Sequence, residues 1–380
     1  MNNQVHKTWI EIDADAIRHN LNLARKLIGP KVAIMAIIKA NAYGHGLFET
    51  ANILQKLTSR ARQSMWCGVD SVDEAQTLRK CGIKNPIMIL GYVPENRILE
   101  VLQRKFHASI YNKETLASVE KILKRNPQIA PRFHLKIETG TNRLGIQLRE
   151  LRRIKNFPPI EGIYTHFADS ENPSSAFYQA QLSSLRKAEN ILASLGIYPR
   201  YFHAASTAAL LQFPETRGNL VRFGIGLYGL WPSEDVRRIM SDKLTLRPVL
   251  TWKTRIAQIK KIQKRETVGY DRTFCTRSSK FIAILPVGYY DGYDRRLSNC
   301  GEVLINGRRA RVIGNVCMNM MMVDLGGISA RVGDTAVLIG KSGKLEISAD
   351  EIADKIGTIN YEVIARISSS IPRIFKNNRH

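Results

Sequence analysis

The sequence predicts an α/β protein, with a (β/α)8 TIM-like barrel over residues 1–243 followed by a C-terminal β-rich domain over residues 244–380. Three observations lead to this class. The first part alternates strand-like and helix-like segments eight or nine times, and several of these strand-like segments are apolar without alternation. The rhythm then changes after about residue 244, and 380 residues exceed the ~250–300 at which a single core stops growing.

The barrel segments begin with TWIEID at 8–13, which reads as a strand. A helix is predicted over 14–29, with Asp13 as its N-cap and Gly29-Pro30 as its stop. Apolar runs without alternation are typical of parallel strands that are covered on both faces. The later strand-like runs are VAIMAIIKA (32–40), MWCGVD (65–70), PIMILG (86–91), HASI (107–110), FHLKIE (133–138), IEGIYTHF (160–167), YFHAAS (201–206) and LVRFGIG (220–226).

The second domain is predicted from short strand-like runs that are separated by turns. Asn306-Gly307 predicts a hairpin turn. A helix is expected over 348–357, with Ser348 as its N-cap and Glu351 closing a capping box. The strand-like runs lie at 246–262, 281–290, 301–307, 309–314, 320–325 and 335–340.

Composition excludes several classes of function. The net charge of +24 is spread along the chain without a long basic tail or an aromatic-interleaved motif, so no specific nucleic-acid partner is expected. No stretch approaches the ~20 apolar residues of a membrane helix, and the N-terminus lacks the apolar region of a secretion signal. Five cysteines without a CxxC spacing fit a reduced, cytoplasmic location, and no metal is expected.

Reactive side chains stand where several predicted barrel strands end. In such barrels, the carboxyl ends of the strands meet on one face and carry the chemistry. A single lysine or histidine at a strand end is usually structural, but five such ends together predict an active site. These residues are Lys39, Lys136 with Glu138, His166, Ser206 with Thr207, and Arg222.

Eight motifs, in order along nearly the whole chain, carry a resemblance to a known family. They are KANAYGHG (39–46), HLKIETGTNRLG (134–145), IYTHFA (163–168), VRFGIGLYG (221–229), VGYD (268–271), PVGYYDGY (286–293), NVCMN (315–319) and INYEV (359–363). In these motifs the chain closely resembles alanine racemase. The resemblance implies a pyridoxal 5′-phosphate (PLP) barrel followed by a β-domain, and the interconversion of L- and D-alanine by two-base proton transfer.

The resemblance also implies which residues hold the cofactor. Lys39 is expected to bind it covalently, because only an amine condenses with the cofactor aldehyde. Arg222 is expected to donate to the pyridine nitrogen, which weakens the ring as an electron sink and favours reprotonation over transamination. The phosphate ligands implied are Tyr43, Thr207, Tyr361 and the backbone N–H groups of Gly224 and Ile225. GIGLYG matches the dinucleotide-binding pattern GxGxxG. It lies in the last barrel unit, however, so a dinucleotide site is not predicted.

The two proton-transferring residues implied are Lys39 on one face of the bound amino acid and Tyr270 on the other. His166 and Arg222 would form a relay that favours the Tyr270 phenolate. In the family this tyrosine reaches the active site of the partner subunit, so a homodimer with shared active sites is implied. The physiological role that the resemblance implies is the supply of D-alanine for the cell wall. Substrate contacts are implied for Arg143, Met318 and Tyr289, and Lys136 matches a position that is carbamylated in several members.

Three departures from the family pattern surround the expected second base. Asp271 stands where glycine is usual, and Asn315 and Asn319 replace an arginine and an aspartate. These changes could alter the substrate range. The alternatives are a racemase of broader specificity, a PLP decarboxylase of the same architecture, and a non-catalytic PLP carrier that resembles the barrel alone.

Overall fold

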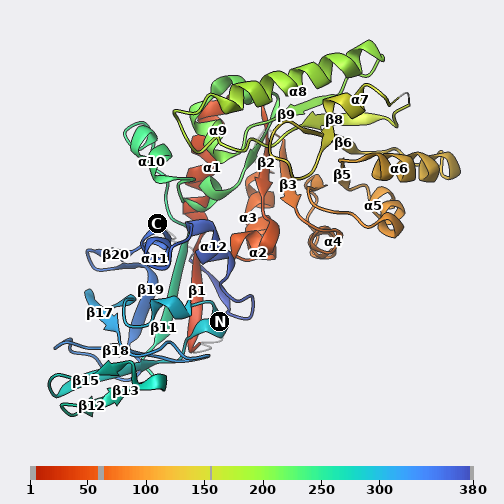
Figure 1. Ribbon diagram of the computed structural model, residues 1–380. Helices are drawn as coiled ribbons and strands as arrows, with labels where there is room; N and C mark the ends of the chain where they lie inside the picture. Colours follow the sequence, from red (N-terminus) through yellow and green to blue (C-terminus); the bar gives the residue numbers. More distant parts are fainter. Residues whose placement is uncertain (1–5, 59–63, 155, 377–380) are drawn as a thin grey trace. The chain divides into compact units, whose positions relative to one another are not determined.

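The computed structural model describes residues 6–58, 64–154 and 156–376, and it consists of two compact units (Figure 1). The barrel unit comprises Ile17–Ala40 and Leu47–Arg247. The β-rich unit comprises the chain up to Ala16, Asn41–Gly46, and the chain from Pro248 onward. The chain therefore leaves the barrel unit briefly within the KANAYGHG motif.

Eight parallel strands form the barrel. Around the sheet they are β10 (Leu220–Phe223), β2 (Ala33–Ile37), β3 (Met65–Val69), β4 (Ile87–Ile89), β5 (His107–Ile110), β6 (Phe133–Glu138), β8 (Ile160–Tyr164) and β9 (Tyr201–His203), and the short β7 (Ile146–Gln147) pairs with β6. The ends of this sheet are joined by hydrogen bonds from Asn219 N to Phe202 O (3.2 Å) and from Arg222 N to Ala205 O (3.0 Å). The predicted (β/α)8 barrel is confirmed.

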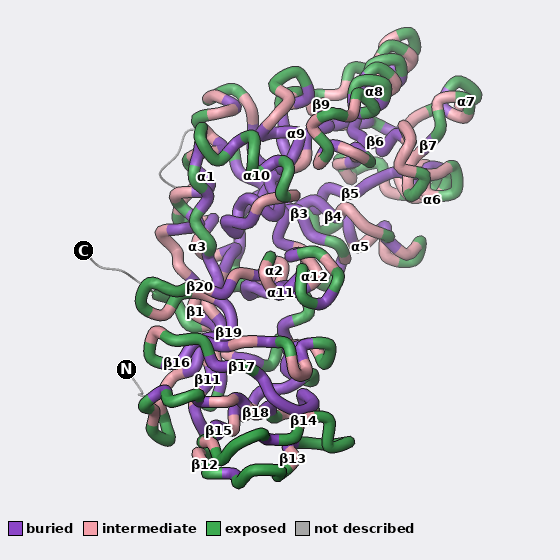
Figure 2. Tube along the Cα trace, turned by 60° about the vertical axis from the view of Figure 1, so that its left-hand side comes forward, coloured by how far each residue is buried: buried purple, intermediate pink, exposed green. Residues whose placement is uncertain are grey.

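The barrel strands are apolar because they are enclosed. Every residue of β2 and β3 is buried, and Figure 2 shows β3 in purple. The connecting helices begin at side-chain caps such as Ser71 and Asn112, which accept from Glu74 N (3.2 Å) and Thr115 N (2.8 Å). The helices are α1 (Ala14–Ile28), α3 (Leu47–Thr58), α4 (Val72–Lys80), α5 (Ile98–Gln103), α6 (Lys113–Arg125), α7 (Leu148–Leu151), α8 (Phe177–Ser194), α9 (Thr207–Gln212) and α10 (Glu234–Met240).

The first strand, β1 (Thr8–Asp13), departs from the predicted boundaries of 1–243 and 244–380. It pairs antiparallel with β11 (Leu250–Arg255) and parallel with β21 (Arg373–Lys376), so TWIEID lies in the sheet of the β-rich unit. Burial alternates along it, as expected for a strand with one solvent-facing side. The alternation in TWIEID is visible in the sequence. With β1 in the second sheet, eight of the described strands remain for the barrel.

The β-rich unit contains one large sheet. Its strands lie in the order β12 (Gln258–Ile262), β15 (Lys280–Leu285), β18 (Met321–Asp324), β17 (Arg308–Val312), β16 (Glu302–Ile305), β19 (Thr335–Ser342), β11, β1 and β21. Asn306 and Gly307 both adopt positive φ (48° and 75°) between β16 and β17, which confirms the hairpin turn. The remaining elements are β13 (Thr267–Val268), β14 (Phe274–Cys275), β20 (Leu345–Ile347), α11 (Ala349–Ile356) and α12 (Asn360–Ala365).

Helix α11 confirms the predicted helix but not its capping box. Ser348 accepts from Glu351 N at 3.0 Å, as expected of an N-cap. The Glu351 carboxylate instead binds Arg309 (2.6 Å) and Lys355 (3.1 Å). The capping box was wrong because two neighbouring cations compete for the carboxylate.

Among the described residues, no helix is both long and apolar enough to cross a bilayer.

Candidate active site

Arg222 is the centre of the hydrogen-bond network inside the barrel. It lies on β10 and is 5% exposed. Its Nη1 donates to His203 Nδ1 (2.9 Å) and His203 O (3.0 Å), and its Nη2 donates to the carbonyls of Thr165 and Ala204 (2.7 Å each). These bonds account for the four Nη hydrogens, and His166 Nδ1 lies 3.4 Å from Nη2.

The remaining donor of Arg222 is Nε–H, for which the described part of the chain provides no acceptor. Burial lowers the pKa of Arg222 to about 10, with the nearby Arg143 acting in the same direction, so the guanidinium stays protonated at neutral pH. No carboxylate is among its hydrogen-bond partners. Arg222 can therefore offer one N–H to a ring nitrogen, and it cannot protonate that nitrogen as an acid would.

Lys39 follows strand β2 and pairs with a carboxylate at the end of the neighbouring strand. Its Nζ lies 3.3 Å from Asp70 Oδ1, and the Lys39 side chain is 41% exposed. The Glu74 carboxylate accepts from Ala40 N (2.8 Å) and Asp70 N (2.7 Å), which ties the two strand ends together. Asp70 and Glu74 were not predicted as site residues from the sequence, although Asp70 ends the run MWCGVD next to the lysine strand.

The backbone after Lys39 forms a left-handed turn. Ala40, Asn41, Ala42 and Tyr43 all have φ of 53–54°. Each such residue costs roughly 1–2 kcal/mol, and consecutive ones are rare outside functional sites. The sequence carries no signal for this, because none of these four residues is a glycine. The turn fixes where the chain goes directly after the lysine.

In the β-rich unit, Tyr43 lies close to Tyr361 of α12, with ring centroids 6.1 Å apart. Arg373 donates to Gly44 O from Nη2 (2.8 Å) and Nε (3.2 Å), which holds the segment that carries Tyr43. Burial raises the pKa of Tyr43 to about 12, so its hydroxyl stays protonated and can donate. Two of the predicted phosphate ligands are thereby brought together.

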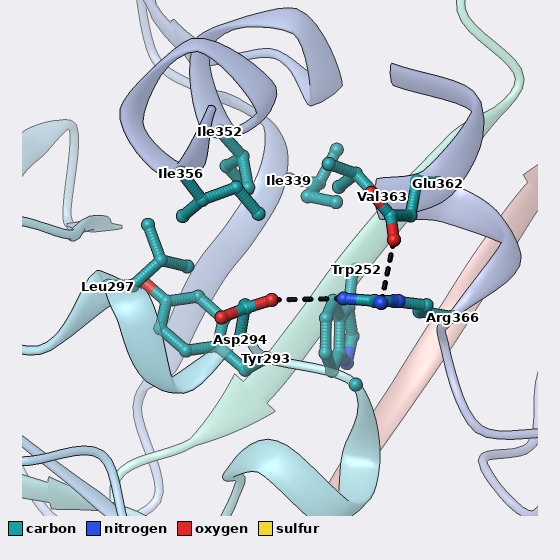
Figure 3. A pocket seen from close by; sticks show the side chains of 11 residues that line it. Trp252, Tyr293, Asp294, Leu297, Ile339, Ile352, Ile356, Glu362, Val363 and Arg366 are labelled. Atoms are coloured by element: carbon teal, nitrogen blue, oxygen red, sulfur yellow. Dashed lines mark hydrogen bonds and ion pairs between the residues drawn. The ribbon is translucent and has the colours of Figure 1, made fainter. Parts of the chain in front are cut away.

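Helix α12, which carries Tyr361, is anchored by Arg366. Figure 3 shows this arginine between the carboxylates of Asp294 (3.2 Å) and Glu362 (2.6 Å), at a small pocket that includes Trp252. The motif PVGYYDGY (286–293) ends directly before Asp294. The segment that follows this motif therefore contacts the C-terminal end of α12 through Arg366.

Gly44 has no room for a side chain, which leads to a stability prediction. An added Cβ would lie 2.0 Å from Ile364 O, and φ is +82°. Gly44→Ala is expected to lower the free energy of unfolding by at least ~3 kcal/mol, from backbone strain plus overpacking. Gly357→Ala is the matched control, because its φ is +68° but nothing lies within 4 Å, and it should lose only about 1–2 kcal/mol. Urea unfolding measures both, and equal losses would contradict the packing argument.

Thr207, Gly224 and Ile225, the other predicted phosphate ligands, lie together in the barrel unit. Thr207 Oγ1 accepts from Gly224 N (3.0 Å) and Gly226 N (3.4 Å), so its own hydroxyl hydrogen is left to donate. Ile225 opens a short 3-10 helix, whose first N–H groups have no partner within the helix. An added Cβ at Gly226 would lie 2.8 Å from Thr207 Cγ2, so glycine is needed for this close approach. The donors suit an anion such as phosphate.

Lys136 and Arg143 line one small pocket together with Glu138 and His166. Burial and the charges of Arg143 and Arg222 lower the pKa of Lys136 to about 8. The Lys136 ammonium lies over the Tyr164 ring at 5.7 Å. Glu138 holds the following loop by accepting from Gly140 N (2.6 Å) and Arg143 N (3.2 Å). The barrel unit thus brings Lys136, Arg143 and His166 together in one pocket.

Tyr270, Tyr289 and Met318 line one surface groove of about 920 Å³ in the β-rich unit. All three side chains are exposed, with Tyr270 at 68%. Tyr289 N donates to Cys317 O at 3.1 Å, and a Cβ at Gly288 would lie 2.1 Å from the same oxygen. The motifs PVGYYDGY and NVCMN therefore meet through a contact that requires glycine.

Two of the departures from the family pattern compensate each other. Asp271 adopts φ of 57°, the region that glycine favours. Its carboxylate accepts from Asn315 Nδ2 (2.9 Å), and the same amide nitrogen donates to Tyr270 O (3.2 Å). The Asn315 amide thus holds the backbone at Asp271 in a conformation that glycine usually adopts. Nothing in the structure explains Asn319.

The chain matches two family models, "Alanine racemase, N-terminal domain" over residues 12–232 and "Alanine racemase, C-terminal domain" over residues 249–375. An alanine racemase of Carboxydothermus hydrogenoformans is 39% identical over 97% of this chain and 99% of its own length. The crystal structure of alanine racemase from Bacillus anthracis with bound L-Ala-P is 34% identical, covers 98% of this chain and 96% of its own, and has a TM-score of 0.90. A Clostridium difficile 630 alanine racemase in complex with cycloserine has 32% identity, coverage of 99% and 97%, and a TM-score of 0.89.

Both units of the chain are matched in order, and the motifs on which the sequence resemblance rests lie inside the matched ranges. The chain belongs to the alanine racemase family.

Proposed function

We propose that the protein interconverts L- and D-alanine with PLP as its cofactor. The observation that carries the proposal is the buried, carboxylate-free environment of Arg222, which leaves a single N–H for a pyridine nitrogen. A decarboxylase of the same architecture is expected to place an acid there, and the relatives found are alanine racemases. The full-length match across both units argues against a carrier that has only the barrel.

The donor set of the chain fits PLP. Lys39 would supply the amine that binds the aldehyde carbon, Arg222 would donate from Nε–H to the ring nitrogen, and Arg143 would donate to the phenolic oxygen. The phosphate would be held by Tyr43, Thr207, Tyr361 and the Ile225 N–H, and the Gly224 N–H would share its present bond to Thr207 Oγ1 (3.0 Å) with the phosphate. When bound, PLP withdraws electrons from the amino-acid Cα and so acidifies its hydrogen.

Racemisation then requires one proton carrier on each face of Cα. Lys39 Nζ takes or returns the proton on one face, and the phenolic oxygen of Tyr270 does so on the other. His166 contacts Arg222 at 3.4 Å, and burial, with Arg222 and Arg143 nearby, lowers the pKa of His166 well below its usual value. A neutral His166 that accepts from Arg222 at Nδ1 carries its hydrogen on Nε2, where it can donate to the Tyr270 oxygen and so favour the phenolate. Met318 N–H orients the substrate carboxylate, and Tyr289 stands at the substrate entrance.

The enzyme works as a homodimer with shared sites in this proposal. Tyr270 and Met318 are exposed on the groove of the β-rich unit, where they are available to a second copy of the chain. The physiological role is D-alanine supply for a bacterial cell wall from the cytoplasm, where the five unpaired cysteines would stay reduced.

The experiment that tests the function is a racemisation screen with alanine, serine, lysine and arginine. Purified protein with added PLP should convert L-alanine to an equal mixture of enantiomers, followed by loss of optical rotation. Preference for another amino acid would redefine the substrate, and release of CO₂ would contradict racemisation. Unchanged alanine would contradict catalysis.

Lys136 is proposed to carry a carbamate formed with dissolved CO₂. The N–C bond forms between neutral Nζ and CO₂, and one proton is released to water. Because the pKa of Lys136 is about 8, its neutral fraction is substantial near neutral pH and rises as pH increases through 8. ¹³C-bicarbonate should give a carbamate NMR signal that grows from pH 7 to 9. Lys136→Met should remove it, and a signal that persists in this variant would disprove the assignment.

A further inference from the structure

A chain of two buried histidines continues from Arg222 into the barrel. His203 and His134 are both 0% exposed, on strands β9 and β6. His203 Nδ1 lies 2.9 Å from Arg222 Nη1, and His203 Nε2 lies 2.9 Å from His134 Nδ1. The His203 ring also stacks on Tyr164, with centroids 4.6 Å apart and planes at 5°. Both nitrogens of His203 are thus engaged, each with one partner.

Arg222 determines where the hydrogens of the two histidines lie. A guanidinium has only donors, so Nδ1 of His203 must accept from Arg222. A neutral imidazole carries one hydrogen, so that of His203 is on Nε2 and is donated to His134 Nδ1. The hydrogen of His134 is then on Nε2. Burial, followed by the nearby Arg222 and His107 respectively, lowers the pKa of His203 and His134 well below the usual value, which keeps both rings neutral.

We infer that His134 is a positioning residue for Arg222, acting through His203: by accepting at Nδ1, it keeps the His203 lone pair directed at the guanidinium. This bond occupies an Nη hydrogen of Arg222 and helps to aim Nε–H toward the cofactor ring. The consequence for catalysis rests on the proposed function, whereas the placement of the hydrogens does not.

The absence of a side chain at Gly162 leaves the space that the His134 ring occupies. A Cβ added to Gly162 on β8 would lie 2.2 Å from His134 Nδ1 and 2.8 Å from its Cγ. The His134 ring also stacks on Tyr201 at 5.8 Å and 12°. A glycine on one side and a parallel ring on the other restrict the His134 side chain to the orientation that faces His203.

The far side of His134 resembles a metal site by distance but not by chemistry. Ligand atoms of His107, His134 and Glu161 lie within 4.8 Å of one another. However, His134 presents a hydrogen at Nε2, and Trp66 Nε1 beside it is a further buried donor without an acceptor among the described residues. Metal binding at His134 Nε2 would require both histidines to reverse their tautomers, which would remove the bond to Arg222. The N–H groups on this side of His134 therefore disfavour a bound cation.

The direct test is ¹⁵N NMR of the holoenzyme labelled at histidine. Wild-type His203 and His134 are expected as neutral Nε2–H tautomers, assigned by the loss of one set of signals in each single variant. An Nδ1–H tautomer at either residue in the wild-type enzyme would overturn the inference, and this outcome needs no variant to fold. Added Zn²⁺ should leave both sets of signals unchanged, and a stoichiometric switch of His134 to Nδ1–H would also overturn it.

A matched pair of variants tests the positioning role. His134→Asn keeps an acceptor near the position of Nδ1, whereas His134→Leu removes it. With alanine as substrate, the leucine variant should lose about tenfold in kcat with little change in KM, and the asparagine variant should recover most of that loss. The His203 signals should follow the same order. His107→Leu, which removes a ring outside the relay, is the control and should leave the His203 tautomer unchanged.

The outcomes separate this inference from the proposed function. Wild-type rates in a folded His134→Leu enzyme would refute the positioning role and leave racemase activity standing. A wild-type protein without racemase activity would refute the proposed function, while the tautomer measurement would still decide the placement of the hydrogens.

Discussion

Lys39→Ala is expected to abolish the visible absorbance of bound PLP and to lower racemase turnover by roughly 10⁴-fold or more, because both covalent binding and one proton carrier are lost. Stability should hardly change, since the Lys39–Asp70 pair is 41% and 55% exposed and surface pairs contribute only about 0–1 kcal/mol. Absorbance spectra, turnover and urea unfolding of the same preparation measure the three effects.

The control for this variant is Asp70→Asn, which removes the charge beside the lysine but keeps the amine. It should retain the absorbance and most of the turnover. If Lys39→Ala still racemised alanine at a tenth of the wild-type rate, another residue would have to carry the proton, and the assignment of Lys39 would be wrong.

Tyr270→Phe should lower racemisation by about 10²–10⁴-fold, which is the usual contribution of a positioned acid or base. The loss should be unequal between the two directions of proton removal, because Lys39 remains on the other face. Exchange of the Cα hydrogen for deuterium, measured separately from L- and D-alanine, detects this difference. Equal exchange from both enantiomers would contradict the two-base mechanism. Tyr270 is 68% exposed, so its hydroxyl should matter little for stability.

The shared site gives a second test of Tyr270. When Lys39→Ala and Tyr270→Phe chains are mixed and allowed to exchange subunits, half the dimers are mixed and each has one site with both native residues. About a quarter of wild-type activity should return, because sites that combine residues from two subunits can be restored in this way. No recovery from a sample whose mass confirms mixed dimers would contradict a shared site.

Much of the fold could be predicted because local patterns and burial agree. The apolar barrel runs are enclosed on both faces, and the hairpin at Asn306-Gly307 uses residues that tolerate positive φ. The proposed roles of Lys39 and Arg222 also follow from the sequence, because motifs at strand ends mark the active face of such a barrel.

Other features depended on contacts that no local pattern encodes. TWIEID could not be assigned to the barrel or to the second sheet until its partners, β11 and β21, were known. Asp70 was missed because its role comes from a neighbouring strand. The histidine relay was missed because His134 and His203 are separated by 69 residues in the chain.

By itself, the sequence determined the class of the barrel, the proposed roles of Lys39 and Arg222, and the family to which the motifs point, because each of these depends on short, contiguous runs of residues. Only the tertiary structure decided the left-handed turn after Lys39, the compensation of Asp271 by Asn315, and the tautomers that Arg222 imposes on two histidines. The physical reason is that a backbone conformation or a proton position is set by the sum of its neighbours in space, and distant segments supply most of those neighbours.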